Sequence, residues 1–211
     1  MSELLLPSGA TVLFQGDSIT DAGRGRDDDQ ALGAGYVNFI AAWLSARYPE
    51  RNLTFLNRGV SGNRIYDLES RWSEDCIALQ PDWLSILIGI NDTWRRYDSN
   101  QASPVEEFEA CFRRLLDRVK KETSARLILL EPFVLPTPPD RVAWREDLDP
   151  RIAASRRVAR DYQAIYVPFD GLFAAAAAQR DPSCWAFDGV HPTQAGHALM
   201  AQAWINAVGG V

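Results

Sequence analysis

Only two histidines occur in the chain, and they limit where acid–base chemistry near neutral pH can take place. His191 lies in the run 188–192, whose glycine and proline disfavour a helix, and Asp188 comes three residues before it. At this spacing a carboxylate can reach the imidazole Nδ1 and hold the ring in one tautomer. A purely local Asp–His contact within a turn would give the same pattern. His197 follows Gly196 in a helical pattern, where we expect a structural role.

Ser18 is the candidate nucleophile for such a base. A serine hydroxyl is a weak nucleophile until a base removes its proton. Ser18 follows a short apolar run and opens a turn. The segment 18–21 also matches a capping box, so a helix N-cap is the competing interpretation of this serine. The chain contains no G-x-S-x-G nucleophile elbow, which disfavours an α/β-hydrolase of the usual type.

An acyl-transfer site also needs hydrogen-bond donors for the oxyanion that develops in the transition state. Gly59 has no side chain and can bring its backbone N–H close to a substrate, and Asn91 can offer its side-chain amide. The backbone N–H of Ser18 is a third candidate. Gly59 could instead be a turn residue, and Asn91 an Asx-turn or cap residue.

Three further residues are candidates for the surroundings of the site. Trp94 and Trp185 lie next to the candidate site segments, where aromatic faces can bind a sugar ring or an acyl group. Packing in the core or at a subunit interface is the alternative for both. Asp17 precedes the candidate nucleophile and can orient its turn, or serve only the structure of that turn. The three cysteines include no C-x-x-C pair, so we expect neither a zinc or other metal site nor a disulfide framework.

Short apolar runs alternate with helical patterns along the chain, which is typical of a parallel sheet covered by helices on both faces. The expected strands are 11–14, 53–57, 84–88, 127–130 and 164–167. The expected helices are 36–47, 64–79, 104–122, 150–162 and 194–207, with Ser103 as the cap before Pro104. The fold class is therefore α/β, a three-layer α/β/α sandwich whose five strands fit a flavodoxin-like order.

Ligands of such folds bind beyond the carboxyl ends of the strands. Small or polar residues follow three of the expected strands at this edge, in the runs 16–18, 57–59 and 89–92. The candidate nucleophile, Gly59 and Asn91 are therefore expected to meet at one edge of the sheet. Each alternative interpretation is plausible for one residue alone, but none explains why all of them converge there.

These residues occur in four ordered blocks, 16–20, Gly59, 89–92 and 188–192, which resemble the blocks of the SGNH, or GDSL, hydrolase family. The resemblance spans nearly the whole chain. It implies that Ser18, Asp188 and His191 form a catalytic triad, that Gly59 and Asn91 with the Ser18 N–H form the oxyanion hole, and that no cofactor is needed.

A narrower resemblance lies in the runs 57–63, 67–68, 71–72, 88–98 and 185–188, which are similar to the intracellular acetyl-xylooligosaccharide esterases of this family. It implies a homo-oligomer that removes acetyl groups from xylo-oligosaccharides or other sugars. A lysophospholipase, a thioesterase or another short-chain esterase on the same triad is the main alternative. A sugar acyltransferase and a non-catalytic carbohydrate-binding protein are two more.

The bulk properties agree with one hydrolase domain over residues 1–211. The net charge of −6 disfavours a nucleic-acid binder, which needs a basic face to displace counterions. The hydrophobic fraction of 46% and the charged fraction of 24% are typical of a globular domain. We see no signal peptide and no apolar run long enough to span a membrane, so we expect a cytoplasmic protein with no membrane partner.

Overall fold

Five parallel strands form a single sheet in the computed structural model, which describes residues 4–210. The strands are β1 (Thr11–Gly16), β2 (Thr54–Gly59), β3 (Trp83–Leu87), β4 (Arg126–Leu130) and β5 (Ile165–Val167). Their order across the sheet is β2-β1-β3-β4-β5. This is the flavodoxin-like order, in which the chain reverses direction across the sheet at β1 and β3. The predicted fold class is confirmed.

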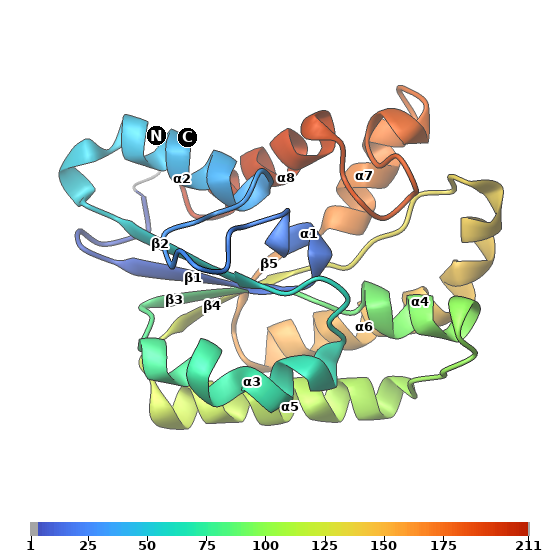
Figure 1. Cartoon of the computed structure of the whole chain (residues 1–211), viewed down its shortest axis with the longest axis horizontal. Coiled ribbons are helices and arrows are strands. Elements are labelled where there is room, and N and C mark those ends of the chain that lie inside the picture. The colour runs from blue at the N-terminus through green and yellow to red at the C-terminus, as the bar shows by residue number, and fades with distance from the viewer. Residues whose placement is uncertain (1–3, 211) are drawn as a thin grey trace.

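Helices cover both faces of this sheet (Figure 1). On one face lie α2 (Tyr36–Arg47), α7 (Phe169–Ala177) and α8 (Gln194–Ala207), and on the other α3 (Ile65–Asp75), α5 (Val105–Glu122) and α6 (Arg145–Asp161). Two shorter helices, α1 (Ser18–Asp21) and α4 (Ile90–Asp98), directly follow β1 and β3. Short 3₁₀ turns occur at Pro49–Arg51, Ile77–Leu79, Pro139–Trp144 and Pro182–Cys184.

The side chains of each strand alternate between two separate cores, as the period of a strand requires. On β1, Val12 and Phe14 pack into the core beneath α2 and α8, whereas Leu13 packs into the core beneath α3 and α5. All three side chains are fully buried. This burial on both faces explains why the strands appear in the sequence as continuous apolar runs.

The structure differs from the sequence predictions at several helix boundaries. The helix expected from Pro150 begins five residues earlier, at Arg145, and includes the proline. Ser103 is not a cap, because the N-cap of α5 is Pro104 and the Ser103 hydroxyl instead donates to Asp92. Neither α4 nor α7 was predicted. No helix within residues 4–210 is long and apolar enough to cross a membrane.

The carboxyl ends of the three neighbouring strands β2, β1 and β3 lie level with one another. Gly16 at the end of β1 is in register with Gly59 on one side and with Leu87 on the other. The segments that follow these strands therefore start from the same edge of the sheet. This edge is where the sequence places its candidate nucleophile and oxyanion donors.

Candidate active site

Ser18 occupies the first position of α1, immediately beyond the end of β1. The N-cap of this helix is Asp17, whose Oδ1 accepts a hydrogen bond from the Ile19 N–H at 3.0 Å. The Asp17 carbonyl accepts from the Asp21 N–H at 2.8 Å. The interpretation of Ser18 as the helix cap is therefore wrong: its neighbour caps the helix and leaves the Ser18 side chain for other contacts.

A chain of hydrogen bonds links Ser18, His191 and Asp188. Ser18 Oγ lies 2.9 Å from His191 Nε2, and His191 Nδ1 lies 2.7 Å from Asp188 Oδ2. Asp188 Oδ1 accepts the backbone N–H groups of His191 at 2.7 Å and of Val190 at 3.0 Å. The Asp–His contact is thus part of a turn, but the same imidazole also reaches a serine 173 positions away. A local turn would not require that second contact.

The electrostatics of this chain of contacts favour a base that accepts a proton from serine. The hydrogen bond with Asp188 raises the pKa of His191, and partial burial of the ring only partly opposes this. Burial of Asp188 acts to raise its own pKa, but the hydrogen bonds from His191 and the two backbone N–H groups outweigh it and the pKa is lowered. The carboxylate is therefore ionised and stabilises the imidazolium that forms on proton transfer.

Asn91 lies in the first turn of α4, where the residue is 4% exposed. Its Nδ2 donates one hydrogen bond to the carbonyl of Asn63 at 3.1 Å. An amide nitrogen carries two hydrogens, so a second donor remains. Gly89, just before the helix, has a φ of +124°, a conformation that side chains disfavour and that permits the abrupt change from strand to helix.

Gly59 does not occupy the position that the sequence suggested. Its N–H donates to Asn57 Oδ1 at 2.8 Å, and its carbonyl accepts from Arg24 Nε at 3.0 Å. A Cβ at this position would lie 2.3 Å from the backbone nitrogen of Asp21. Gly59 is therefore required for the close approach of β2 to the nucleophile turn, and its N–H is already paired in this structure.

Gly62, three residues later, faces the cleft instead. The N–H groups of its neighbours are paired: Val60 with Gly16 O at 3.0 Å, Ser61 with Asp21 Oδ2 at 3.0 Å, and Asn63 with Val60 O at 3.1 Å. Among residues 4–210, the Gly62 N–H has no such partner. The glycine has a φ of +84°, which a left-handed turn requires.

The cleft next to Ser18 has a volume of about 340 Å³. Its lining residues come from four segments of the chain: Ser18, Ser61, Gly62, Asn91, Trp94, Arg95, Asp98 and His191. Sequence analysis missed Ser61, Gly62, Arg95 and Asp98. All four lie in the runs 57–63 and 88–98, but the selection followed single residue types rather than whole turns.

The three residues that were expected around the site lie in different positions relative to the cleft. Trp94 lines the cleft, and the centre of its ring lies 5.7 Å from that of His191. Trp185 does not line it and packs against the core, with its Nε1 buried and without a partner among the described residues. Asp17 lies beneath the nucleophile turn, fully buried, and this burial raises its pKa to about 7.

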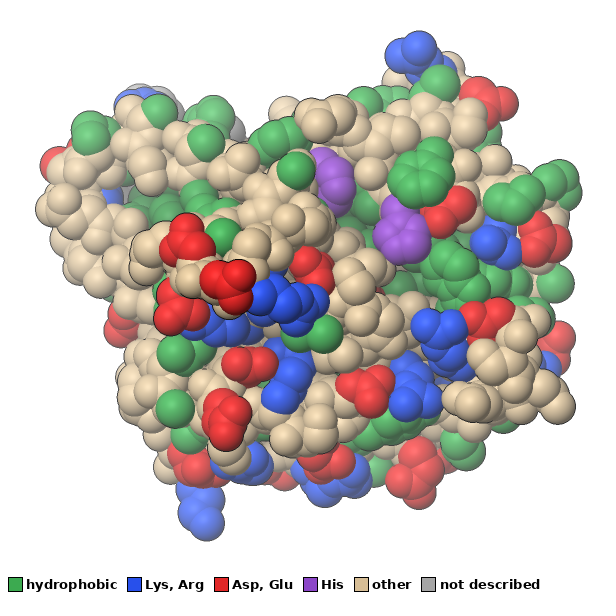
Figure 2. Space-filling view, in the orientation of Figure 1, with side chains coloured by type: hydrophobic (Ala, Val, Ile, Leu, Met, Phe, Trp, Pro, Cys, Tyr) green, Lys and Arg blue, Asp and Glu red, His purple; other side chains and the backbone are tan. Residues whose placement is uncertain are grey.

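Aromatic side chains surround the catalytic histidine candidate, and one of them was missed by sequence analysis. Phe187 stacks on His191 with 5.9 Å between ring centres, although 64% of Phe187 is exposed. Both histidines of the chain are visible on one face in Figure 2, one of them beside an acidic side chain and hydrophobic side chains. Arg141 lies over the Trp144 ring, and its Nε donates a hydrogen bond to the Asp188 carbonyl at 3.2 Å.

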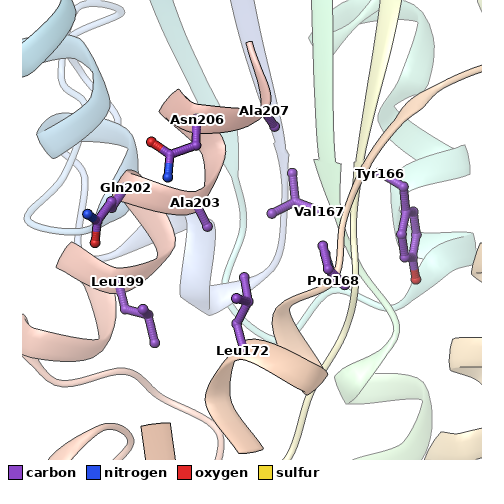
Figure 3. Close-up of a pocket in the computed structure, with 9 residues that line it drawn as sticks. All are labelled: Tyr166, Val167, Pro168, Leu172, Leu199, Gln202, Ala203, Asn206 and Ala207. Carbon is purple, nitrogen blue, oxygen red and sulfur yellow. The ribbon is translucent and has the colours of Figure 1, made fainter. Parts of the chain in front are cut away.

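A larger hollow of about 410 Å³ lies elsewhere, between the end of β5 and helices α7 and α8 (Figure 3). Its lining is mostly apolar, with Leu172 and Leu199 beside Gln202 and Asn206. It contains no residue of the hydrogen-bonded chain from Ser18 to Asp188. The size of a hollow alone would therefore not have located the cleft next to Ser18.

Residues 4–210 contain no group of three or more His, Cys, Asp or Glu side chains arranged to hold a metal ion.

The sequence from residue 14 to residue 199 matches the model of the GDSL-like lipase/acylhydrolase family. The chain belongs to this family. It is a carboxylic ester hydrolase, and the predicted family and enzyme class are confirmed.

Individual relatives agree with this assignment. The chain is 37% identical to an acetylxylan esterase of Geobacillus stearothermophilus over 210 residues, which cover 96% of this chain and 95% of the relative. The crystal structure of Axe2, an acetylxylan esterase from the same organism, has a TM-score of 0.89 with 36% identity, and the match covers 98% of this chain and 97% of Axe2.

Two other solved structures are also similar over the whole chain. A putative GDSL-like lipase from Parabacteroides merdae has a TM-score of 0.94 with 37% identity and covers 99% of this chain and 100% of its own. The α/β hydrolase LAE5 from the Lake Arreo metagenome has a TM-score of 0.91 with 35% identity and covers 99% of each chain.

Proposed function

We propose that this esterase acts through a triad of Ser18, His191 and Asp188 and removes short acyl groups, above all acetyl, from xylo-oligosaccharides or other sugars. The single observation that carries the mechanism is the unbroken contact chain from Ser18 Oγ through both ring nitrogens of His191 to Asp188. Ser18 and His191 line a cleft, and Gly62 and Asn91 line the same cleft.

The reaction begins when Ser18 Oγ attacks the ester carbonyl while His191 Nε2 accepts the serine proton. Negative charge develops on the carbonyl oxygen, next to the N–H groups of Ser18 and Gly62 and the free amide hydrogen of Asn91. We assign Gly62 rather than Gly59 here, because the Gly59 N–H is paired with Asn57.

The tetrahedral intermediate then collapses, and the sugar alcohol leaves with the proton from His191. The acyl group remains as an ester on Ser18. His191 next takes a proton from a water molecule, whose oxygen attacks the acyl-enzyme. The acid leaves, the proton returns to Ser18 Oγ, and the enzyme is restored. No metal or organic cofactor takes part in any of these steps.

The lining of the cleft favours a short acyl group on a polar alcohol. Besides the proposed catalytic residues, the cleft contains Ser61, Arg95 and Asp98, and its one large apolar side chain is Trp94. A long acyl chain needs a continuous apolar channel to be removed from water. A sugar instead combines polar hydroxyls with faces that pack on aromatic rings, which Trp94 and the exposed Phe187 offer. The acetylxylan esterase activity of the Geobacillus relative supports the same choice.

The triad is tested by replacing Ser18 with alanine. We expect Ser18→Ala to lower kcat for aryl acetate hydrolysis by about 10⁶-fold, because a triad loses most of its effect when one member is removed. Ser73→Ala, in helix α3 outside the cleft, is the matched control and should keep wild-type kcat. Wild-type turnover in a correctly folded Ser18→Ala protein would refute the proposed nucleophile.

The substrate is tested by a panel at fixed enzyme concentration. It contains acetylated xylo-oligosaccharides, aryl acetate, butyrate and octanoate, a lysophospholipid and an acetyl thioester. We expect kcat/KM to be highest for acetyl sugars and to fall with acyl length. A maximum for the octanoate or lysophospholipid would overturn the substrate assignment but not the triad. Addition of a sugar acceptor to the same assays reports acyl transfer as a second ester product.

A further inference from the structure

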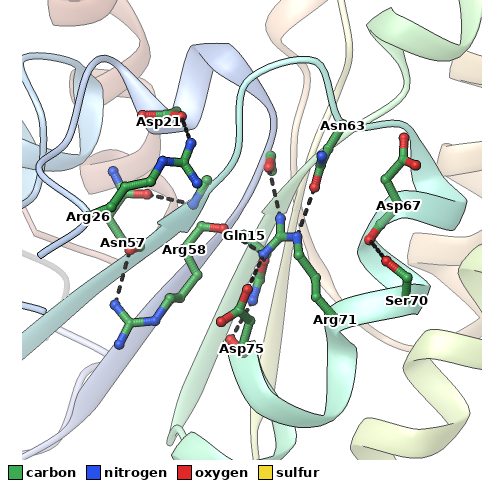
Figure 4. A network of polar contacts seen from close by, with 12 residues as sticks. Gln15, Asp21, Arg26, Asn57, Arg58, Asn63, Asp67, Ser70, Arg71 and Asp75 are labelled. Carbon is green, nitrogen blue, oxygen red and sulfur yellow. Dashed lines mark hydrogen bonds and ion pairs between the residues drawn. The ribbon is translucent and has the colours of Figure 1, made fainter.

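The side chain of Arg71, in the middle of helix α3, extends toward the carboxyl ends of β1 and β2 (Figure 4). Only 16% of the side chain is exposed. Its guanidinium has five acceptors: Gln15 Oε1 at 3.0 Å, the Arg58 carbonyl at 2.8 Å, the Gly16 carbonyl at 3.3 Å, Asn63 Oδ1 at 2.8 Å and Asp75 Oδ2 at 2.9 Å.

Three of these acceptors belong to the segments that carry the proposed oxyanion donors. Gly16 ends the strand that leads to Ser18, two residues later. Arg58 lies at the end of the strand that leads to the turn 60–63. Asn63 directly follows Gly62, and its carbonyl receives the hydrogen bond from Asn91. One planar group thus bonds directly to two of the three segments that carry the oxyanion donors, those of Ser18 and Gly62. It reaches the third, helix α4, only through Asn63, whose carbonyl accepts from Asn91.

The chemistry of this contact set suits arginine and not lysine. A guanidinium presents five N–H donors in one rigid plane, whereas an ammonium is a compact charge that cannot span carbonyls of two strands and a loop. Burial lowers the pKa of Arg71, which reflects the cost of removing its charge from water. Asp75, four residues later on the same helix, offsets part of this cost by a direct ion pair.

We propose that Arg71 is a positioning residue for the oxyanion hole, which fixes the ends of β1 and β2 and the Gly62–Asn63 turn relative to one another. This inference rests on the proposed function, since it assumes that the Ser18 and Gly62 N–H groups and the Asn91 amide stabilise the transition state. Such donors act only if they are held in place before the reaction, and a displacement of about 1 Å can cost about 10²-fold in rate.

The test compares Arg71→Lys and Arg71→Met with the wild-type enzyme. Arg71→Lys keeps the charge that pairs with Asp75 but loses the planar set of donors. We expect kcat to fall about 10-fold in Arg71→Lys and about 10²-fold in Arg71→Met, with KM within about twofold, because the oxyanion exists only in the transition state. The affinity for an alkyl boronic acid, which forms a tetrahedral adduct on the serine, should fall in parallel with kcat.

A control variant and a pH profile distinguish the loss of a positioning role from a general loss of native structure. The matched control is Arg114→Met. Arg114 also pairs with helix α3, through Glu69, but it does not contact the strands. The control variant should keep wild-type kcat and boronate affinity. The pH midpoint of kcat/KM should also be unchanged in the Arg71 variants, since the His191–Asp188 pair is untouched. If Arg71→Met does not fold, Arg71→Lys alone decides the question.

The inference is overturned if Arg71→Lys, or a folded Arg71→Met, keeps wild-type kcat, or if boronate affinity stays constant while kcat falls. The Ser18→Ala variant separates this failure from failure of the proposed function. An active Ser18→Ala protein would refute the triad itself. An inactive Ser18→Ala protein beside fully active Arg71 variants would refute only the positioning role.

Discussion

At the scale of single residues, the proposed chemistry depends on the surroundings of one imidazole. His191 lies between the rings of Trp94 and Phe187, with Asp188 on one nitrogen and Ser18 on the other. Partial burial of the imidazole acts to lower its pKa. Asp188 has the larger and opposite effect, so the pKa lies above the ordinary value of 6.5.

This balance predicts the pH profile of Asp188→Asn. His191 acts as a base when neutral, so kcat/KM rises with pH through its pKa. Without the carboxylate the burial that lowers the pKa remains, and the midpoint of the acid limb should move to lower pH than in the wild type. We also expect kcat to fall about 10⁴-fold at its plateau, because the tautomer is no longer fixed. The measurement is kcat/KM for aryl acetate between acidic and neutral pH.

Asp161→Asn, at the end of α6 away from the cleft, is the control for that profile and should leave both the midpoint and the plateau unchanged. An acid limb that stays in place in Asp188→Asn would contradict the view that Asp188 sets the pKa of His191.

The choice between Gly59 and Gly62 is also decided at the residue scale. In a crystal structure of the phosphonate adduct on Ser18, we expect the phosphoryl oxygen to lie about 3 Å from the Gly62 nitrogen and the Asn91 amide. The Gly59 N–H should remain on Asn57 Oδ1. A phosphoryl oxygen bound to the Gly59 nitrogen would reverse the assignment and show that the Asn57 contact breaks on binding.

At the scale of elements, helix α4 carries Asn91 and Trp94 and depends on a buried ion pair for its position. The fully buried Arg151 of α6 donates to Asp147 Oδ2 at 3.0 Å and to Thr93 Oγ1 at 3.2 Å. The Thr93 hydroxyl in turn donates to Asp147 at 2.8 Å. Removal of the carboxylate would leave the arginine charge buried without its partner.

Asp147→Leu should therefore lower the free energy of unfolding by about 3–5 kcal/mol, the usual cost of removing one partner of a buried pair. The measurement is the midpoint of urea unfolding. The adjacent Glu146→Gln removes an exposed pair with Arg96 and should change the free energy by less than about 1 kcal/mol. Equal midpoints for Asp147→Leu and the wild type would show that Arg151 finds another partner.

The element boundaries that sequence analysis missed also have physical causes. Pro150 lacks a backbone N–H and was expected to begin its helix, yet α6 starts at Arg145, with Glu146 and Asp147 in its first turn. Tertiary contacts hold that first turn, because Arg145 pairs with Asp170 and Asp147 accepts a hydrogen bond from the Thr93 hydroxyl of α4. Contacts between residues so far apart in the sequence outweigh a local preference.

At the scale of the whole molecule, the order of the strands brings the site together. With β1 at the centre and β2 and β3 on either side, the segments after all three strands start level with one another. The last loop, which carries Asp188 and His191, joins them from the far end of the chain. That the chain assembles into a homo-oligomer stays a prediction, which a light-scattering mass of two or more times the 23.6 kDa of one chain would support.

The amino-acid sequence by itself determined the fold class, the family and the types of group available for catalysis. Continuous apolar runs specify strands that are buried on both faces, and a chain with two histidines offers few bases. Ser18, Asp188, His191 and Asn91 were selected in this way. The reason is that side-chain chemistry and short-range periodicity are properties of the sequence, which need no knowledge of distant contacts.

Only the tertiary structure decided which backbone N–H groups remain unpaired. Every residue except proline has an N–H, so the sequence cannot show that the Gly59 donor is paired with Asn57 while the Gly62 donor finds no partner within the described range 4–210. It likewise could not show that Trp185 packs against the core, that Phe187 stacks on His191, or that Arg71 bonds to the ends of both β1 and β2. Each of these facts is a pairing between distant positions, which only the folded chain brings within contact.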